Sequence, residues 1–253
     1  MELGLKGKVA IVTGTGRQGA LGEAIALELA REGADIACVD IVIEGAEAIA
    51  KEIRDMKRRS IAVKVDQSEL QQVKDAVAKI NTELGPVDIL VNNAALMGPF
   101  GRIERMDLKD WQRMVRVNLD GAYYWIREVW NTMVEKKWGR IINIASIAGV
   151  MGGFGQANYS ASKAGVIALA KTAALEGARK GITANAVTLG VVATGQSAET
   201  GEAAERLKAR IAQRRFGEPT DVAAMVAFLA SDRAGYITGQ DIHVMGGLDL
   251  FTY

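Results

Sequence analysis

The chain has 253 residues, 49% of them hydrophobic, and its 31 Lys and Arg residues nearly balance 30 Asp and Glu residues. A net charge of +1 argues against a nucleic-acid groove or a polybasic membrane patch. The single cysteine, Cys38, excludes an intramolecular disulfide. Residues 1–8 lack a signal-like apolar region and no segment is long enough to span a bilayer. We therefore expect a cytoplasmic protein without nucleic-acid or membrane partners.

Short runs rich in β-branched residues alternate with helical patterns along the chain. The expected strands are residues 8–13, 34–40, 60–65, 87–91, 140–145, 182–187 and 241–244. The expected helices are residues 22–32, 44–58, 69–84, 108–136, 158–180 and 220–231. This alternation is typical of a parallel sheet with helices on both faces. We predict an α/β fold, with a single domain over residues 1–253 built on a Rossmann-like, doubly wound parallel sheet of about seven strands.

Residues 194–216 interrupt this alternation. The segment is polar, has no strand pattern and lies between the sixth expected strand and the next expected helix. A loop of this length in a compact domain usually has a functional role. We expect it to act as a substrate lid.

A glycine-rich turn follows the first expected strand. It contains Gly14, Gly16, Arg17, Gly19, Leu21 and Gly22. Glycines at a strand-to-helix turn let the backbone approach a pyrophosphate, which binds at the helix N-terminus where N–H groups and the dipole favour negative charge. A glycine cluster alone is a weak signal, but its position after the first strand of a βαβ unit predicts a dinucleotide site.

Polar residues close the next expected strands. Asp40 ends the second strand, where a carboxylate binds the adenosine ribose and repels a 2′-phosphate, unless it is only a turn aspartate. Asp66 and Gln67 follow the third strand, and Asp66 either accepts a hydrogen bond from the adenine amino group or caps a turn. Asn92 and Ala94 follow the fourth strand, at the edge where open α/β sheets bind ligands.

Ser146, Tyr159 and Lys163 form the strongest chemical signal. Ser146 follows the fifth expected strand, and Tyr159 and Lys163 are i and i+4 on one face of the next helix. Lowering a tyrosine pKa from about 10 to near 7 takes roughly 4 kcal/mol. We expect Lys163 and a positively charged nicotinamide to supply it, while Ser146 holds the substrate oxygen. The alternative is a surface pair on a helix and an unrelated serine.

With these motifs the chain resembles the short-chain dehydrogenase/reductase family over nearly its whole length. The family's motifs match residues 92–95 (Asn-Asn-Ala-Gly in the family), Asn118, Ser146, Tyr159, Lys163 and residues 189–194 (Pro-Gly-x-Val-x-Thr). The resemblance implies that Tyr159 donates or accepts the proton, that Ser146 positions the substrate oxygen, and that Lys163 lowers the tyrosine pKa and binds the nicotinamide ribose. It also implies that Asn118 holds a water in a proton relay.

The resemblance implies further cofactor contacts. Val192 and Thr194 would contact the nicotinamide carboxamide, and Asn92 and Ala94 would line the adenosine ribose and nicotinamide region. No metal is expected, and His243, the only histidine, is interpreted as structural.

The chain departs from the family pattern at three places. The phosphate loop is two residues longer, so that Gly22 matches the last glycine and either Gly19 or Ala20 the middle one. Ala95 and Leu189 stand where the family usually has a glycine and a proline. We expect Leu189 to reshape the nicotinamide side of the pocket.

The cofactor preference is predicted from the residues around the expected ribose site. Asp40 is followed by Ile41 and not by the basic residue that NADP-preferring relatives carry there. A carboxylate beside a 2′-phosphate is unfavourable because like charges repel in a partly enclosed site. Arg17 is the one contrary signal. We therefore expect NAD rather than NADP.

The expected substrate pocket is apolar. It comprises Leu96, Met97, Phe100, Ile147, Met151, Phe154 and Leu189, next to Ser146 and Tyr159. Such a pocket favours NAD(H)-dependent interconversion of a hydrophobic ketone and a secondary alcohol, although some of these residues could instead pack in the core.

Two other functions stay open. The second half of the chain resembles 3-oxoacyl carrier-protein reductases, which implies an NADP(H)-dependent reductase of 3-oxoacyl groups on a carrier protein or CoA. Those enzymes dock the carrier with arginines on two helices, where this chain has Asn131 and Leu175, with Arg127 and Arg179 nearby. The other alternative is a nucleotide-binding sensor without turnover, but such proteins usually lose the tyrosine or the lysine.

The expected assembly is a homotetramer. The two long helices expected at residues 108–136 and 158–180 cannot bury all of their apolar surface on one sheet, and related enzymes pair them across a two-fold axis. The apolar tail, residues 248–253, is expected to pack on a neighbouring subunit.

Overall fold

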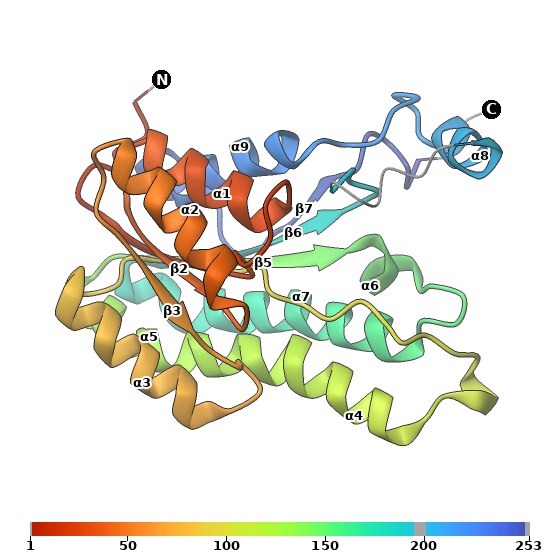
Figure 1. Cartoon of the computed structure of the whole chain (residues 1–253), viewed down its shortest axis with the longest axis horizontal. Coiled ribbons are helices and arrows are strands. Elements are labelled where there is room, and N and C mark those ends of the chain that lie inside the picture. The colour runs from red at the N-terminus through yellow and green to blue at the C-terminus, as the bar shows by residue number, and fades with distance from the viewer. Residues whose placement is uncertain (1, 195–200, 251–253) are drawn as a thin grey trace.

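A seven-stranded parallel sheet with helices on both faces organises the computed structural model, which describes residues 2–194 and 201–250 (Figure 1). The strands are β1 Val9–Thr13, β2 Asp35–Asp40, β3 Ser60–Lys64, β4 Ile89–Asn92, β5 Gly139–Ser146, β6 Ile182–Leu189 and β7 Asp241–Val244. Their order is β3-β2-β1-β4-β5-β6-β7. The predicted fold class is confirmed. Because the strand order reverses between β1 and β4, a ligand crevice is expected at the carboxyl ends of these two strands.

Side chains alternate along each strand, so each face of the sheet packs against its own layer of helices. Ala10 and Val12 of β1 belong to a core with α1 (Leu21–Arg31), α2 (Ile43–Asp55) and α9 (Pro219–Ala230). Val9 and Ile11 face the other way, toward α3, α5 and α7. The bounds on that face are α3 Leu70–Glu83, α5 Gly121–Lys136 and α7 Ala157–Gly177. The period of two along each strand therefore attaches a helical layer to each face (Figure 1).

The long helix expected at residues 108–136 is present but contains a π-helical turn. It consists of α4 (Leu108–Val115), the turn Arg116–Asp120 and α5. The extra residue of a π turn changes which side chains face the sheet, and such turns often occur at functional sites. Here the turn carries Asn118.

Within the described residues, two α-helices were not expected from the sequence. The first is α6 (Ile147–Met151), a short helix directly after β5. The second is α8 (Glu202–Arg210), which lies within the segment predicted to be a lid; residues 195–200 of that segment are outside the described residues. Residues 251–253 of the apolar tail are outside them as well. Within residues 2–194 and 201–250, no helix has both the length and the apolar character needed to cross a bilayer.

Candidate active site

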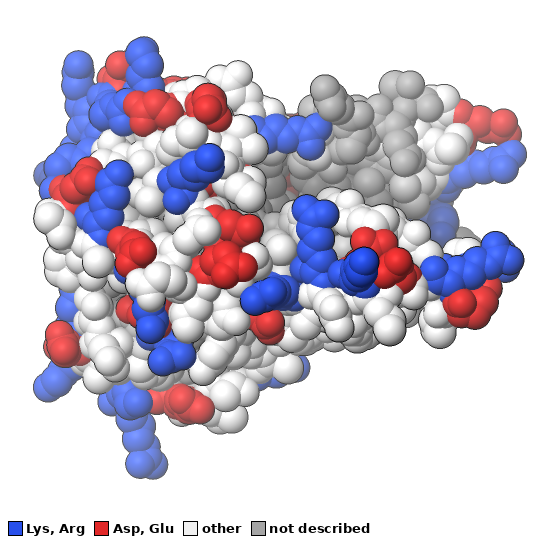
Figure 2. Space-filling model, turned by 60° about the horizontal axis from the view of Figure 1, so that its bottom comes forward, with Lys and Arg blue, Asp and Glu red and all other residues white. Residues whose placement is uncertain are grey.

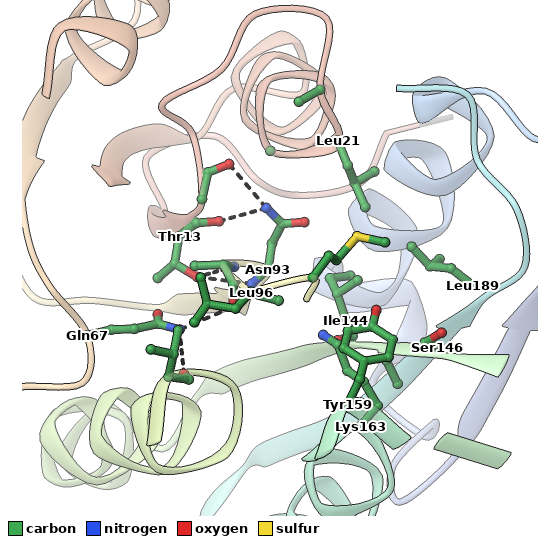
Figure 3. A pocket seen from close by; sticks show the side chains of 18 of the residues that line it. Thr13, Leu21, Gln67, Asn93, Leu96, Ile144, Ser146, Tyr159, Lys163 and Leu189 are labelled. Atoms are coloured by element: carbon green, nitrogen blue, oxygen red, sulfur yellow. Dashed lines mark hydrogen bonds between the residues drawn. The ribbon is translucent and has the colours of Figure 1, made fainter. Parts of the chain in front are cut away.

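A cavity of about 1080 Å³ opens along the carboxyl ends of the strands (Figure 3). It extends from the glycine-rich turn after β1, past the ends of β4 and β5, to the segment that follows β6. Pockets for single drug-sized ligands usually measure about 300–1,000 Å³. The cavity is therefore large enough for a dinucleotide and part of a substrate.

Most of the site residues predicted from the sequence line this cavity. They are Gly14, Arg17, Leu21, Asp40, Ile41, Asp66, Gln67, Ala94, Leu96, Met97, Ser146, Ile147, Tyr159, Lys163, Leu189, Val192 and Thr194. The described residues that were predicted and do not line it are Gly16, Gly19, Asn92, Phe100, Asn118, Met151 and Phe154.

The turn after β1 has the geometry of a phosphate cradle. Gly14 has a φ of +78°, and a Cβ on Gly22 would lie 2.0 Å from the Gly14 carbonyl oxygen, so the turn packs directly on the first turn of α1. The residue before α1, Ala20, has no side chain that could cap the helix, and the Leu21 end of α1 lines the cavity. Backbone N–H groups at such an end bind anions. These residues fit the pyrophosphate of a dinucleotide.

Of the two candidates for the middle glycine of the lengthened loop, Ala20 lines the cavity and Gly19 does not. Gly19 has a φ of +69°, which glycine adopts readily and alanine does not. Its N–H donates to the Glu23 carboxylate at 2.6 Å, on α1. This hydrogen bond fixes the loop to the helix that it precedes.

The two carboxylates of the expected adenosine half accept hydrogen bonds from neighbouring turns. Asp40 accepts hydrogen bonds from the backbone N–H groups of Gly16 at 2.7 Å and Val42 at 2.9 Å. Asp66 accepts from the N–H and the hydroxyl of Ser68, as expected for a turn cap. Each carboxylate is thus partly compensated by polar groups of the chain itself.

Two amide side chains fix the loop after β4. Gln67 donates from Nε2 to the carbonyl oxygens of Ala94 at 3.1 Å and Val117 at 2.9 Å, and so connects this loop to the π-helical turn (Figure 3). Asn93 donates to the Thr13 carbonyl at 2.8 Å. These contacts hold the edges of β1 and β4 at a fixed separation.

Asn93, and not Asn92, faces the cavity. Asn92 is buried and donates to the Asn143 side chain at 2.9 Å and, at 3.3 Å, to the carbonyl of Ala122. Asn92 and Asn143 are register partners on β4 and β5, so strand alternation directs both away from the ligand side. The predicted cofactor contact of Asn92 therefore does not involve its side chain.

Ser146, Tyr159 and Lys163 converge at the floor of the cavity (Figure 3). Ser146 ends β5 and caps α6 by accepting from the Ala148 N–H at 3.2 Å. Tyr159 lies in the first turn of α7, and Lys163 lies one turn later with 4% of its surface exposed. The Lys163 ammonium donates to the Ile144 carbonyl at 2.8 Å and lies 5.8 Å from the centre of the Tyr159 ring.

Burial dominates the electrostatics of this floor. It raises the pKa of Tyr159, and a hydrogen bond with Ser146 only partly offsets the effect. Burial also lowers the pKa of Lys163 to about 8. The expectation that the tyrosine pKa is lowered overall differs from this result, because desolvation of the phenol outweighs the effect of Lys163, whose ammonium is itself desolvated and hydrogen-bonded to Ile144. In the chain alone, burial therefore favours the protonated form of Tyr159.

Asn118 connects the elements around the floor. Its Oδ1 accepts from the Leu96 N–H at 2.7 Å, and its Nδ2 donates to the Leu96 carbonyl at 3.1 Å and the Ser162 hydroxyl at 3.3 Å. The residue is 3% exposed. Its side-chain amide is engaged in fixing Leu96 against α7.

Fewer of the predicted substrate-pocket residues line the cavity than the sequence suggested. Ile147 lines the cavity, but Met151 is 64% exposed at the far end of α6 and Phe154 is 87% exposed beyond it. The short helix α6 turns these later side chains away from the floor. Phe100 contacts Tyr159 edge-on, with ring centres 6.0 Å apart.

Four residues that form one wall of the cavity were not predicted from the sequence. Along α4 and the π-helical turn, Lys109, Gln112, Arg113 and Arg116 all line it. Their positions repeat with helical spacing, which places them on one face. That spacing was readable in the sequence, but nothing there indicated that this face points to the ligand.

Known proteins match the chain over nearly its whole length. A family model described as enoyl-(acyl carrier protein) reductase matches residues 14–249. A 3-oxoacyl-(acyl-carrier-protein) reductase from Staphylococcus epidermidis is 43% identical over 244 residues, 95% of this chain and 98% of the relative. The enzyme of that name from Haemophilus influenzae is 39% identical, covering 97% of this chain and 100% of the relative.

A solved structure is also similar. It is described as a putative gluconate dehydrogenase from Agrobacterium tumefaciens, and it matches with a TM-score of 0.94 at 30% identity over 100% of both chains. The fold is therefore shared in full, while the names of the relatives differ in substrate.

The predicted preference for NAD over NADP is wrong. The relatives are 3-oxoacyl-(acyl-carrier-protein) reductases, which are NADPH-dependent. The prediction treated Asp40 as a bare charge facing the cofactor, whereas the N–H groups of Gly16 and Val42 compensate it. Arg17 lines the same part of the cavity. From the matched length and the identity, the chain belongs to the short-chain dehydrogenase/reductase family of oxidoreductases.

Proposed function

We propose that the protein is an NADP(H)-dependent reductase of 3-oxoacyl thioesters, which converts the 3-oxo group to a 3-hydroxyl group. The observation that carries this proposal is the 43% identity to a 3-oxoacyl-(acyl-carrier-protein) reductase over 95% of the chain. The sequence predicted a general interconversion of ketones and secondary alcohols, and this proposal restricts the substrate to 3-oxoacyl thioesters.

The floor of the cavity supports this direction of reaction. A bound reduced nicotinamide would supply a hydride to the 3-oxo carbon. Tyr159 donates its phenolic proton to the oxygen as the C=O bond becomes C–O, and Ser146 donates a hydrogen bond to the same oxygen. Because burial raises the pKa of Tyr159, the phenol stays protonated at neutral pH, as reduction requires.

Lys163 stabilises the phenolate that the proton transfer leaves on Tyr159. After Tyr159 gives up its proton, the resulting phenolate lies near the Lys163 ammonium, whose charge stabilises it. With a pKa of about 8, Lys163 holds its proton at neutral pH and can also release it at low cost. The apolar side chains of Leu96, Met97 and Ile147 line the cavity and would contact the acyl chain.

The experiment offers the purified enzyme NADPH with two thioesters of N-acetylcysteamine, acetoacetyl and crotonyl. The proposal expects the acetoacetyl compound to yield the 3-hydroxybutyryl thioester, identified by mass spectrometry, and the crotonyl compound to remain unchanged. Reduction of the crotonyl double bond without reduction of the ketone would contradict it in favour of an enoyl reductase.

A further inference from the structure

We propose that Lys109 and Arg113 on α4 bind a phosphate of the pantetheine-type arm that carries the 3-oxoacyl group. The inference rests on the proposed function and adds the means by which the enzyme recognises the carrier. The arm could belong to coenzyme A or to a carrier protein, which share this chemistry: a thioester at one end and a phosphate at the other.

The first observation is position. Lys109, Arg113 and Arg116 have i, i+4 and i+7 spacing, and all three line the cavity that holds Tyr159. They extend over about 10 Å of helix. All three are exposed, and the face seen in Figure 2 carries Lys and Arg side chains interspersed with Asp and Glu side chains. The cations therefore form one wall of the site.

The second observation is charge. None of the three forms an ion pair with any residue in the described ranges, whereas Lys51 pairs with Asp55 and Lys79 with Glu83 on other helices. Leaving three cations without partners along one wall gives it a positive potential that attracts anions.

The remaining charges of the cavity do not cancel this potential. Of the described residues that line it, only Asp40 and Asp66 are acidic, and both accept hydrogen bonds from the turns of the adenosine half. Next to the wall, Asp107 caps α4 by accepting from the Lys109 N–H and Asp110 directly follows Lys109, but neither carboxylate lines the cavity. The wall is thus a cationic surface with no anionic lining residue beside it.

The third observation is the position of each cation along the helix, which distinguishes a cofactor end of the wall from a substrate end. Arg116 directly precedes Val117, whose carbonyl accepts from Gln67 in the adenosine half. Arg113 and Lys109 lie four and eight residues before Val117, or about 6 and 12 Å along the helix from that contact. A phosphate bound to them would reach the reacting carbonyl through the linker that joins it to the thioester. A pantetheine arm has this form, and a small phosphorylated ketone does not.

The test compares a substrate that has the phosphates and the full pantetheine arm with one that has only the thioester end of the arm. Acetoacetyl-CoA is the first, and acetoacetyl-N-acetylcysteamine is the second. At low ionic strength, Lys109→Ala/Arg113→Ala should lower the ratio of kcat/KM for the CoA thioester to that for the short thioester by about tenfold. Lys51→Ala/Lys79→Ala removes the same charge away from the cavity and should leave the ratio unchanged.

A third arm uses the acetoacetyl group on an acyl carrier protein. An equal loss with CoA and with the carrier protein supports recognition of the shared phosphate. A loss with the carrier protein alone would overturn the inference, because the contact would then be with the protein surface. An unchanged ratio, or a parallel rise in KM for NADPH, would overturn it too. Failure of the wild-type enzyme to reduce any thioester would instead overturn the proposed function.

Discussion

The floor of the cavity and its α4 wall carry their charges in opposite ways. On the floor, Tyr159 and Lys163 are buried, and loss of solvent shifts the pKa of each. On the wall, Lys109 and Arg113 are exposed and act through their charge across solvent. The comparison indicates that residues of the floor determine the rate of the chemical step, whereas residues of the wall determine how tightly the substrate binds. Mutations should therefore separate into effects on kcat and effects on KM.

The largest effect is expected from Tyr159→Phe. Removing the phenolic hydroxyl removes the proton donor, and general acid groups typically contribute about 10²–10⁴-fold to the rate. The variant should lose this factor in kcat and keep its affinity for NADPH within a few-fold, measured by quenching of protein fluorescence. Retention of more than about a tenth of the wild-type kcat would show that another group donates the proton.

Lys163→Met should separate activity from stability. Burial lowers the Lys163 pKa from 10.5 to about 8, and this difference corresponds to about 3 kcal/mol of disfavoured charge in the folded state. Between those two pH values the unfolded chain binds more protons than the folded one, so wild-type stability increases with pH there. The Lys163→Met variant has no titratable group at this position, so its stability does not increase with pH in this way.

The expected result is a nearly inactive protein that resists urea better than the wild type at pH 7, by up to about 3 kcal/mol. Its advantage should shrink as the pH rises from 8 to 10.5. A variant less stable than the wild type at pH 7 would show that the hydrogen bond to Ile144 outweighs the cost of burying the charge.

Arg17→Ala should affect the cofactor and leave the floor intact. Arg17 lines the cavity beside Asp40, whose carboxylate is compensated by backbone N–H groups. We expect KM for NADPH to rise about tenfold and KM for NADH to change little, because only NADPH presents a 2′-phosphate. Arg31→Ala, on the exposed end of α1, serves as the control. Equal changes for both cofactors would assign Arg17 to the shared pyrophosphate.

The smallest effect is expected far from the cavity, at His243→Gln. Burial disfavours the imidazolium, but Asp249 at 2.7 Å and Asp241 at 3.3 Å outweigh it and raise the His243 pKa. The resulting stability is fully present below the ordinary pKa of about 6.5 and is lost as the pH rises through the raised value. The variant should be less stable by up to about 1 kcal/mol at pH 5.5 and equal to the wild type at pH 9. A loss that persists at pH 9 would indicate a packing role.

The sheet was predictable from the sequence for a physical reason. Each strand is a short β-branched run between helical patterns, and every expected strand overlaps the observed one. Ser146, Tyr159 and Lys163 were found because strand ends and i, i+4 spacing are local properties. Their convergence needs only the neighbouring pair β5 and α7.

Features that depend on tertiary contacts were not predictable. The choice of Asn93 over Asn92 depends on the register of β4 against β5. The exposure of Met151 depends on α6, which is too short for a periodic pattern to identify. The raised pKa of Tyr159 depends on its burial, which pairwise reasoning about Lys163 omits. The α4 wall depends on which face of the helix meets the cavity.

The most direct measurement compares substrates at equal cofactor and enzyme concentrations. NADPH oxidation with acetoacetyl-N-acetylcysteamine and NADP⁺ reduction with gluconate are followed at the same wavelength. A floor built to protonate the ketone of an apolar acyl chain predicts a kcat/KM at least about 100-fold higher for the thioester. Faster turnover of gluconate would contradict the account and assign the site to a sugar acid.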